Sequence, residues 1–271
     1  MLFRSVRSQL HSLPNRSYLD IISMDSKLLY LAADVVAPSL TRIFNLSLTT
    51  GDVPADWKVA RVTPIFKDKG SRNDYSCYRP ISVLSHVSRI LDKYIQSDYM
   101  DFLSKHNLIT PDQSASLKYH STQTALHYMV DDWLHSFDEG TPTVAAFLDL
   151  QKCFDTIDHK ILLHKLESYG ISGKENAWFK SYLNGRSQAV SCNGRLSKVQ
   201  NIKLGVPQGS SLGPTLFLIY INDFPSAMKY VNVDCLLMTP LSTVHVRRLQ
   251  KQNCRYSLTS VTRLTGFPLI N

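Results

Sequence analysis

One carboxylate stands out in the stretch "VAAFLDLQKCFDTIDHKILLHKL", residues 144–166. Asp149 ends an apolar run that is typical of a buried strand, where a carboxylate costs free energy unless a cation or donor meets it. It could hold Mg²⁺, because this cation prefers carboxylate oxygens and often uses one or two of them with substrate phosphates. It could also cap nearby backbone, and this segment alone favours that role. Asp155 and Asp158 are expected to be loop and helix-cap residues.

A second stretch, "LGVPQGSSLGPTLFLIYINDF" (204–224), places glycines, prolines and an amide ahead of an apolar helix. Gly205 and Gly209 allow the backbone to approach a ligand closely, and Gln208 lies in the same turn. The N-terminus of the following helix favours phosphate. The alternative is an ordinary loop that leads into a helix.

Cations gather in a third stretch, "VTPIFKDKGSRNDYSCYRPISVLS" (62–85). Lys67, Lys69 and Arg79 could bind phosphates, the arginine through its planar guanidinium group. The alternative is a solvated loop, which is the usual setting of scattered charges.

Secondary structure must position these residues. The patterns predict strands at 57–66 and 143–149, a polar turn at 67–77, and a hairpin formed by "QAVSCNG" and "KVQNIKLG". We expect Pro38 to divide the helical segment at 26–50, and Asp158 and Gly170 to bound the segment at 159–169. The helical segments are predicted at 26–50, 83–105, 121–138, 159–169, 174–184 and within "SSLGPTLFLIYINDF". This mixture predicts an α+β fold.

Composition bounds the classes of partner. The net charge of +8 would ordinarily suggest a polyanion, but no acidic residue follows Asp234 and five basic ones do. Residues 1–234 therefore carry only +3. The five cysteines are widely spaced and form no C-x-x-C, which predicts a reduced intracellular protein without disulfides. No run reaches the ~18 apolar residues of a membrane span, so we expect no membrane partner.

Taken together and in this order, the stretches resemble the reverse transcriptase, an RNA-directed DNA polymerase, of jockey-like non-LTR retrotransposons. The resemblance runs from about residue 19 to about residue 235. Its matching stretches are "DWKVARVTPIFKDKG", "YRPISVLSHVSRILDKYI", "HNLITPDQSASLKYHSTQTAL", "FLDLQKCFDTIDHKILLHKLESYGI" and "GVPQGSSLGPTLFLIYINDF".

The resemblance implies a right-hand polymerase fold of the α+β class, with fingers and a thumb around a palm. It divides the chain into an N-terminal helical segment (1–50), fingers (51–142) and a partial palm (143–236), with the thumb absent. The remaining residues, 237–271, do not match the family pattern.

Roles in nucleotide binding are also implied by the resemblance. Phe154 matches the aromatic gate beside the incoming sugar, where a ring would exclude a ribose 2′-hydroxyl. Lys67 and Arg79 match finger residues near the triphosphate. Gln208 and Gly209 match the loop that lies against nucleotide and template.

The family's chemistry is phosphoryl transfer by two Mg²⁺ ions, with deoxynucleoside triphosphates, an RNA template and a DNA primer as partners. Asp149 matches the first metal-binding, catalytic aspartate of the palm. Two ions a few ångströms apart need more than one carboxylate. The family supplies the others on a hairpin soon after the 205–224 stretch.

That second acidic motif is missing here. The chain reads "VNVDCLLMTPLSTVHVRRLQKQ", with no adjacent acidic pair. Asp234 is the lone candidate, and its use would require a register shift.

The codons suggest a cause for the missing motif. Because Met is ATG and Thr is ACN, reading one nucleotide earlier turns Met238-Thr239 into N-A-T followed by G-A-C. This gives Asp-Asp opposite Leu237 and Met238 when the Leu237 codon ends in G. We therefore hypothesise a frameshift just upstream of Leu237, with residues 237–271 out of frame; coding DNA without that pair would refute it.

Two functions from different classes remain. The first is the RNA-directed DNA polymerase domain of a mobile element, inactive in this chain because its second acidic motif is missing. The second is a non-catalytic retroelement remnant that binds nucleic acid weakly at most.

Overall fold

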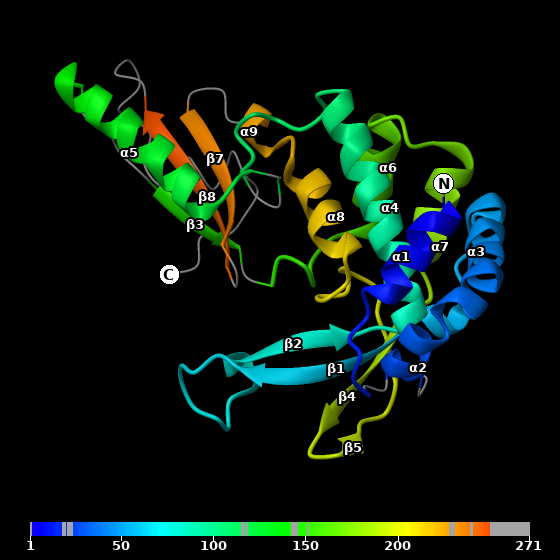
Figure 1. The fold of residues 1–271 in the computed structure, drawn as a ribbon. Helices are drawn as coiled ribbons and strands as arrows, with labels where there is room; N and C mark the ends of the chain where they lie inside the picture. Colours follow the sequence, from blue (N-terminus) through cyan, green and yellow to red (C-terminus); the bar gives the residue numbers. More distant parts are fainter. Residues whose placement is uncertain are drawn as a thin grey trace. The chain divides into compact units, whose positions relative to one another are not determined.

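The computed structural model (Figure 1) divides the chain into two compact units, Met1–Leu108 with Lys152–Tyr220, and Ile109–Gln151 with Ile221–Asn271. For residues 146–149, 231–238 and 241–249 only the backbone is described. The described residues are 2–17, 20, 24–114, 117, 119–141, 146–150, 152–227, 231–238 and 241–249. Among them, no helix is long and apolar enough to cross a membrane.

Helices form most of the first unit. α3 packs against both α1 and α7, α1 also contacts α4, and α6 contacts α7. Phe44 of α3 meets Trp57 edge-on, with ring centroids 5.7 Å apart, and both side chains are buried. The helices are α1 (Leu2–His11), α2 (Ser26–Leu31), α3 (Ala33–Thr50), α4 (His86–Lys105), α6 (His159–Ser168), α7 (Gly173–Leu183) and α8 (Leu212–Ile221).

The helical segment at 26–50 does form two helices, but the prediction that Pro38 divides them is wrong. The break is at Ala32, which has φ −91° and ψ 10° and separates α2 from α3. Pro38 lies inside α3. There it removes one backbone hydrogen bond, a cost that the fully buried neighbours Ala37 and Phe44 offset by packing.

A sheet completes the first unit. β1 (Val59–Phe66) pairs antiparallel with β2 (Tyr78–Val83) and parallel with β4 (Ser187–Cys192). The predicted strand at 57–66 therefore begins two residues later, because Ala55–Lys58 forms a 3₁₀ turn.

The predicted pairing of "QAVSCNG" with "KVQNIKLG" is confirmed, but a further short strand lies between them. "QAVSCNG" forms β4, but the tight turn at Asn193 and Gly194, with φ 50° and 74°, leads directly to β5 (Arg195–Leu196). Two successive positive φ values suit the twist of a two-residue hairpin. "KVQNIKLG" supplies β6 (Gln200–Asn201), which pairs with the other end of β4.

The second unit contains a three-stranded sheet in the order β3-β8-β7. These strands are β3 (Ala146–Leu150), β7 (Val231–Met238) and β8 (Leu241–Leu249), all antiparallel to their neighbours. α5 (Thr122–Asp138) and α9 (Phe224–Ala227) contact β7. The strand predicted at 143–149 is thus present from Ala146, and residues 143–145 lie outside the described residues. The α+β class is confirmed.

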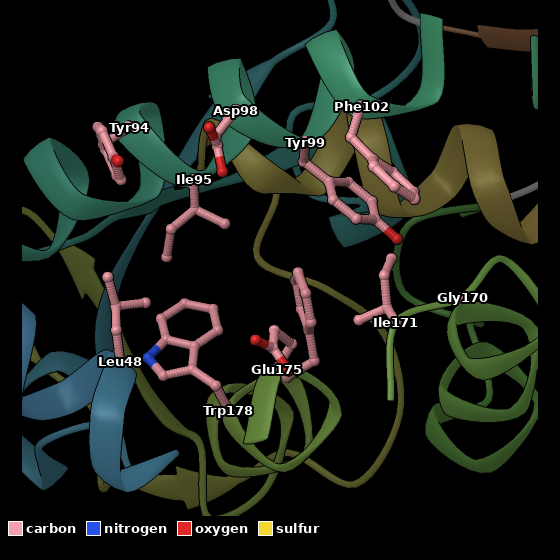
Figure 2. Close-up of a pocket in the computed structure, with 11 residues that line it drawn as sticks. Leu48, Tyr94, Ile95, Asp98, Tyr99, Phe102, Gly170, Ile171, Glu175 and Trp178 are labelled. Carbon is pink, nitrogen blue, oxygen red and sulfur yellow. The ribbon is translucent and has the colours of Figure 1, made fainter. Parts of the chain in front are cut away.

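Figure 2 shows a largely apolar cavity of about 460 Å³ between α3, α4 and α7 of the first unit. Tyr99 and Phe102 project into it from α4 and Trp178 from α7. Asp98 and Glu175 contribute carboxylates to the lining. None of the residues that the sequence assigned to nucleotide binding lines this cavity.

Leu162 of α6 offers a direct test of the helical core. Its side chain is fully buried, whereas the adjacent Ile161 is 49% exposed. We expect Leu162→Ala to lower the free energy of unfolding by about 3 kcal/mol, since it removes buried methyl groups and leaves a cavity. Ile161→Ala is the matched control and should change it by about 1 kcal/mol or less. Equal losses in urea unfolding would contradict the burial of this face of α6.

Candidate active site

The β1–β2 hairpin positions the two cations predicted to bind phosphates. Lys67 follows β1 directly and its backbone N–H donates to the Cys77 carbonyl at 2.9 Å, while Arg79 pairs with Ile65. The Lys67 ammonium group donates to the Ser76 carbonyl, also at 2.9 Å. Arg79 is half-buried, and its Nε has no hydrogen-bond partner among the described residues. A buried, unpaired guanidinium nitrogen favours an incoming anion.

The loop that contains Gln208 is fixed to the end of the same hairpin. The Ser82 N–H of β2 donates to the Gln208 carbonyl at 2.7 Å. Gly209 follows with φ +125°, and a Cβ there would lie 2.5 Å from the Ser82 carbonyl oxygen. The sequence interpretation assigned this close approach to a ligand, whereas in the structure the close neighbour is the backbone of β2.

The same loop is also fixed to the turn that carries Phe154. Gly205 and Val206 donate their N–H groups to the carbonyls of Ile157 and Phe154, each at 2.8 Å. A Cβ on Gly205 would lie 2.7 Å from both the Phe154 oxygen and the Asp155 Cα. The glycine therefore serves contact between two backbone segments, and the turn and loop are held as one piece.

Side chains reinforce this contact. The Phe154 ring packs against Phe217 of α8, with centroids 5.3 Å apart. The Nε2 of buried His159 lies 2.7 Å from the Gly205 carbonyl oxygen. Because a carbonyl only accepts, this nitrogen carries the proton and donates.

The two nearby aspartates behave as the sequence suggested. Asp158 caps α6 by accepting from the Lys160 and Ile161 N–H groups, and these bonds lower the pKa of its carboxyl group. Burial raises the pKa of the Asp155 carboxyl group, and the charge of Lys152 opposes the rise.

A buried polar cluster beside the loop was missed at the level of sequence. Asp92 of α4 is 2% exposed, and the Tyr182 hydroxyl donates to its Oδ2 at 3.3 Å. The Arg186 guanidinium lies over the Tyr182 ring, 4.8 Å from its centroid, and donates to the Tyr182 carbonyl at 3.0 Å. Tyr182 also hydrogen-bonds Ser210, and the Ser210 hydroxyl accepts from the Gly213 N–H at 2.8 Å. The signal in the sequence was a lone carboxylate on the apolar side of a helix.

Burial raises the pKa of the Asp92 carboxyl group to about 7, although the charges of Arg186 and Arg89 and the Tyr182 hydroxyl oppose the rise. Burial likewise raises the pKa of the Tyr182 hydroxyl. The cluster therefore joins α4 and α7 to the start of α8 through groups that are costly to ionise.

Asp149 belongs to the second unit, although it lies only five residues before Phe154 in the chain. It pairs with Thr243 of β8, which in turn pairs with Leu236 of β7. Among the three paired strands, the only other acidic residue is Asp234, opposite His245.

Comparison with known proteins now decides the family. Residues 67–245 match the family model for reverse transcriptase, described as an RNA-dependent DNA polymerase. The chain belongs to the reverse transcriptase family. It is 32% identical over 211 residues to the RNA-directed DNA polymerase from mobile element jockey of Drosophila melanogaster, which covers 78% of this chain and 23% of that protein. The corresponding Drosophila funebris protein is 32% identical over 203 residues, or 75% of this chain and 22% of its own length.

This reverse transcriptase chain thus spans less than a quarter of the length of these curated relatives. The predicted resemblance to jockey-like non-LTR elements is confirmed. The family match covers every residue assigned to nucleotide binding and also Asp149.

Asp149 and Asp234 are the two acidic residues on the described strands of the second unit that a pair of Mg²⁺ ions could use. Asp234 lies two strands away from Asp149 and two residues further back along the sheet, a backbone separation of about 12 Å. Two catalytic ions sit about 4 Å apart and need shared carboxylates. Within the described residues no group of three or more His, Cys, Asp or Glu side chains could hold a metal ion.

Gly205 tests the backbone contact between turn and loop. We expect Gly205→Ala to lower the free energy of unfolding by at least about 1 kcal/mol more than Gly185→Ala. Gly185 is the matched control because it also has a positive φ, 70°, but has nothing within 4 Å of an added Cβ. Urea unfolding measures both, and equal effects would mean that the turn and the loop are not in contact.

Asp92 gives the stability a defined pH dependence. Its folded pKa of about 7 lies above the value near 4 of an unfolded chain, so the folded state takes up a proton. Its contribution to stability is complete below about pH 4 and is lost as the pH rises through 7. The difference in free energy of unfolding between wild type and Asp92→Asn should therefore change by a few kcal/mol, on the order of 1.4 per pKa unit.

Asp158→Asn is the matched control for Asp92→Asn, because the pKa of Asp158 is lowered and its titration falls below this window. Urea unfolding at a series of pH values checks the prediction. If the two variants show the same dependence between pH 4 and pH 8, Asp92 is not buried as described.

Proposed function

We propose that the chain is an RNA-directed DNA polymerase domain of a mobile element, with its nucleotide-binding part assembled and its metal-binding part incomplete. Residues 51–142 would form the fingers and 143–236 the palm, with 1–50 upstream of the fingers. One observation carries the proposal. The loop at Gln208 is bonded on one side to Ser82 of β2 and on the other to the turn of Phe154.

These bonds support a common site for the residues that the family pattern assigns to nucleotide binding. Arg79 would bind a phosphate through the guanidinium group whose Nε is buried and lacks a partner in the described part of the chain. Lys67 would add a second positive charge from the end of β1. Phe154, held against Phe217, would exclude a ribose 2′-hydroxyl and so select deoxynucleotides.

This chain lacks the second acidic motif that the family's phosphoryl transfer requires. With Asp149 as the lone carboxylate at its end of the sheet, no reaction step is assigned to this chain. The shifted reading frame assigns the missing pair to Leu237 and Met238. They are the last two residues of β7 and pair with Ser242 and Leu241 of β8.

A frameshift upstream of Leu237 remains our proposal for the loss of this pair. The family match extends to residue 245, so it includes residues 237–245 of the proposed out-of-frame tail. Residues 239, 240 and 250–271 of the proposed out-of-frame tail lie outside the described residues.

The incomplete acidic set favours one second candidate, a remnant that binds nucleotide or nucleic acid without catalysis. It shares the nucleotide-binding framework with the first candidate and differs only in activity.

Primer extension on an RNA template with Mg²⁺ tests the proposal. We expect no extension by the chain as it stands, and extension once the shifted frame is restored from Leu237 onward together with the thumb. Asp149→Asn in the restored chain should lower the rate by about a thousandfold, since it removes a carboxylate that holds the ions. Asp158→Asn is a control of equal charge change.

Phe154→Ala in the restored chain should admit ribonucleotides. A restored chain that extends no primer would refute the polymerase assignment. Extension by the present chain that is lost on Asp149→Asn would refute its proposed inactivity and the remnant.

A further inference from the structure

A second cavity, of about 340 Å³, lies in the first unit outside the residues discussed so far. It is lined by the end of α1 and the segment that follows it, by the first turns of α4, and by Ser211. α1 and α4 run beside each other in Figure 1. Four basic side chains and no acidic one line the cavity: Arg16, His86, Arg89 and Lys93.

Helical spacing explains three of these basic residues. His86, Arg89 and Lys93 are separated by three and four positions, so they share one face of α4. Arg16, from the segment after α1, and Ile90 of α4 also line the cavity. Arg16, Arg89 and Lys93 form none of the ion pairs found among the described residues.

Two carboxylates adjoin residues of this cavity. Asp20 accepts from the N–H of His86, which lines the cavity, at 2.8 Å and from the Met24 N–H at 2.9 Å, so both its oxygens bind backbone. Asp92 is buried against Tyr182, and burial favours its neutral form, although the charge of Arg89 opposes this. Among the described residues, neither forms a salt bridge with Arg16, Arg89 or Lys93. Phosphate is the anion that arginine recognises best through its planar donors.

Gln9 favours a hydrogen-bond donor on the ligand, whereas the basic side chains favour an anion. Its amide oxygen is buried and has no hydrogen-bond partner within the described ranges. An unpaired buried acceptor favours a ligand with a donor, and a phosphodiester has none. The ribose 2′-hydroxyl of RNA is a donor next to a phosphate, and deoxyribose lacks it.

We propose that this cavity binds the sugar–phosphate backbone of single-stranded RNA. Arg16, Arg89 and Lys93 contact a phosphate, and Gln9 accepts from the neighbouring 2′-hydroxyl. A cavity of this volume is in the usual range for one small ligand group.

The inference rests on the proposed function, which supplies an RNA template as the strand. Ser211 lies three residues after Gln208, so the cavity and the nucleotide loop share one segment of chain. The proposal gives the residues after α1 a role that the sequence did not suggest.

Binding of a fluorescent oligouridylate to the full chain, without metal or nucleotide, tests the site. Arg89→Gln and Lys93→Gln should each weaken binding by roughly fivefold, the value of one exposed ion pair. Each should also reduce the slope of log affinity against log salt by about 0.7, the share of one phosphate contact on a single strand.

Arg42→Gln and Lys180→Gln are matched controls, because both residues are exposed and neither lines the cavity. Losses in the controls equal to those in the cavity variants would overturn the proposal, since charge alone would then explain them. Displacement of the RNA by a deoxynucleoside triphosphate in wild type would also overturn it, because the cavity would then serve free nucleotide.

The ribose contact has its own readout. Wild type should bind oligouridylate more tightly than oligodeoxyuridylate of the same length, and Gln9→Leu should abolish that preference while leaving DNA affinity unchanged. Equal affinities in wild type would overturn the role of Gln9.

The results of these binding measurements are independent of whether the chain is a polymerase. RNA binding that depends on Arg89 in a frame-restored chain with no polymerase activity would retain the site and refute the function. Primer extension with unaltered RNA binding in every cavity variant would retain the polymerase function and refute the RNA site.

Discussion

Close backbone contact at two glycines is the constraint on which the part of the structure proposed to bind nucleotide depends. Gly205 leaves no room for a Cβ against the Phe154 turn, and Gly209 leaves none against Ser82. The adjacent hydrogen bonds use backbone groups only, so they are insensitive to which side chains surround them. Three segments far apart in the chain are thereby held in one framework.

This framework is connected to a cluster of polar groups that are unusual in a protein core. Asp92, Tyr182 and Arg186 are almost fully buried, and Ser210 connects them to the start of α8. Such clusters bring little net stability, because desolvation offsets much of what their mutual attraction contributes. They do fix geometry, since moving one member leaves the others without partners.

The part proposed to bind metal follows a different constraint, the spacing of strands in a sheet. Neighbouring strands are about 4.8 Å apart and β8 lies between β3 and β7, so the backbone of every β7 residue is roughly 10 Å or more from that of Asp149. β7 carries one acidic residue, Asp234, and ends with Leu237 and Met238, which carry no carboxylate. The fold of the hairpin and its chemistry are thus separable, since backbone pairing persists without the carboxylates.

The sequence by itself determined the family, the α+β class, most helices and the absence of an adjacent acidic pair after the 205–224 stretch. Apolar periodicity and caps such as Asp158 act within one element, so they can be read locally. The tertiary structure decided what the local pattern left open. It placed the break between α2 and α3 at Ala32, because packing outweighs the cost of Pro38. It assigned the two glycines to backbone contacts, and it brought Arg16 and Arg89 together across one cavity. These outcomes depend on which distant segments meet, and spacing along a single chain carries no record of that.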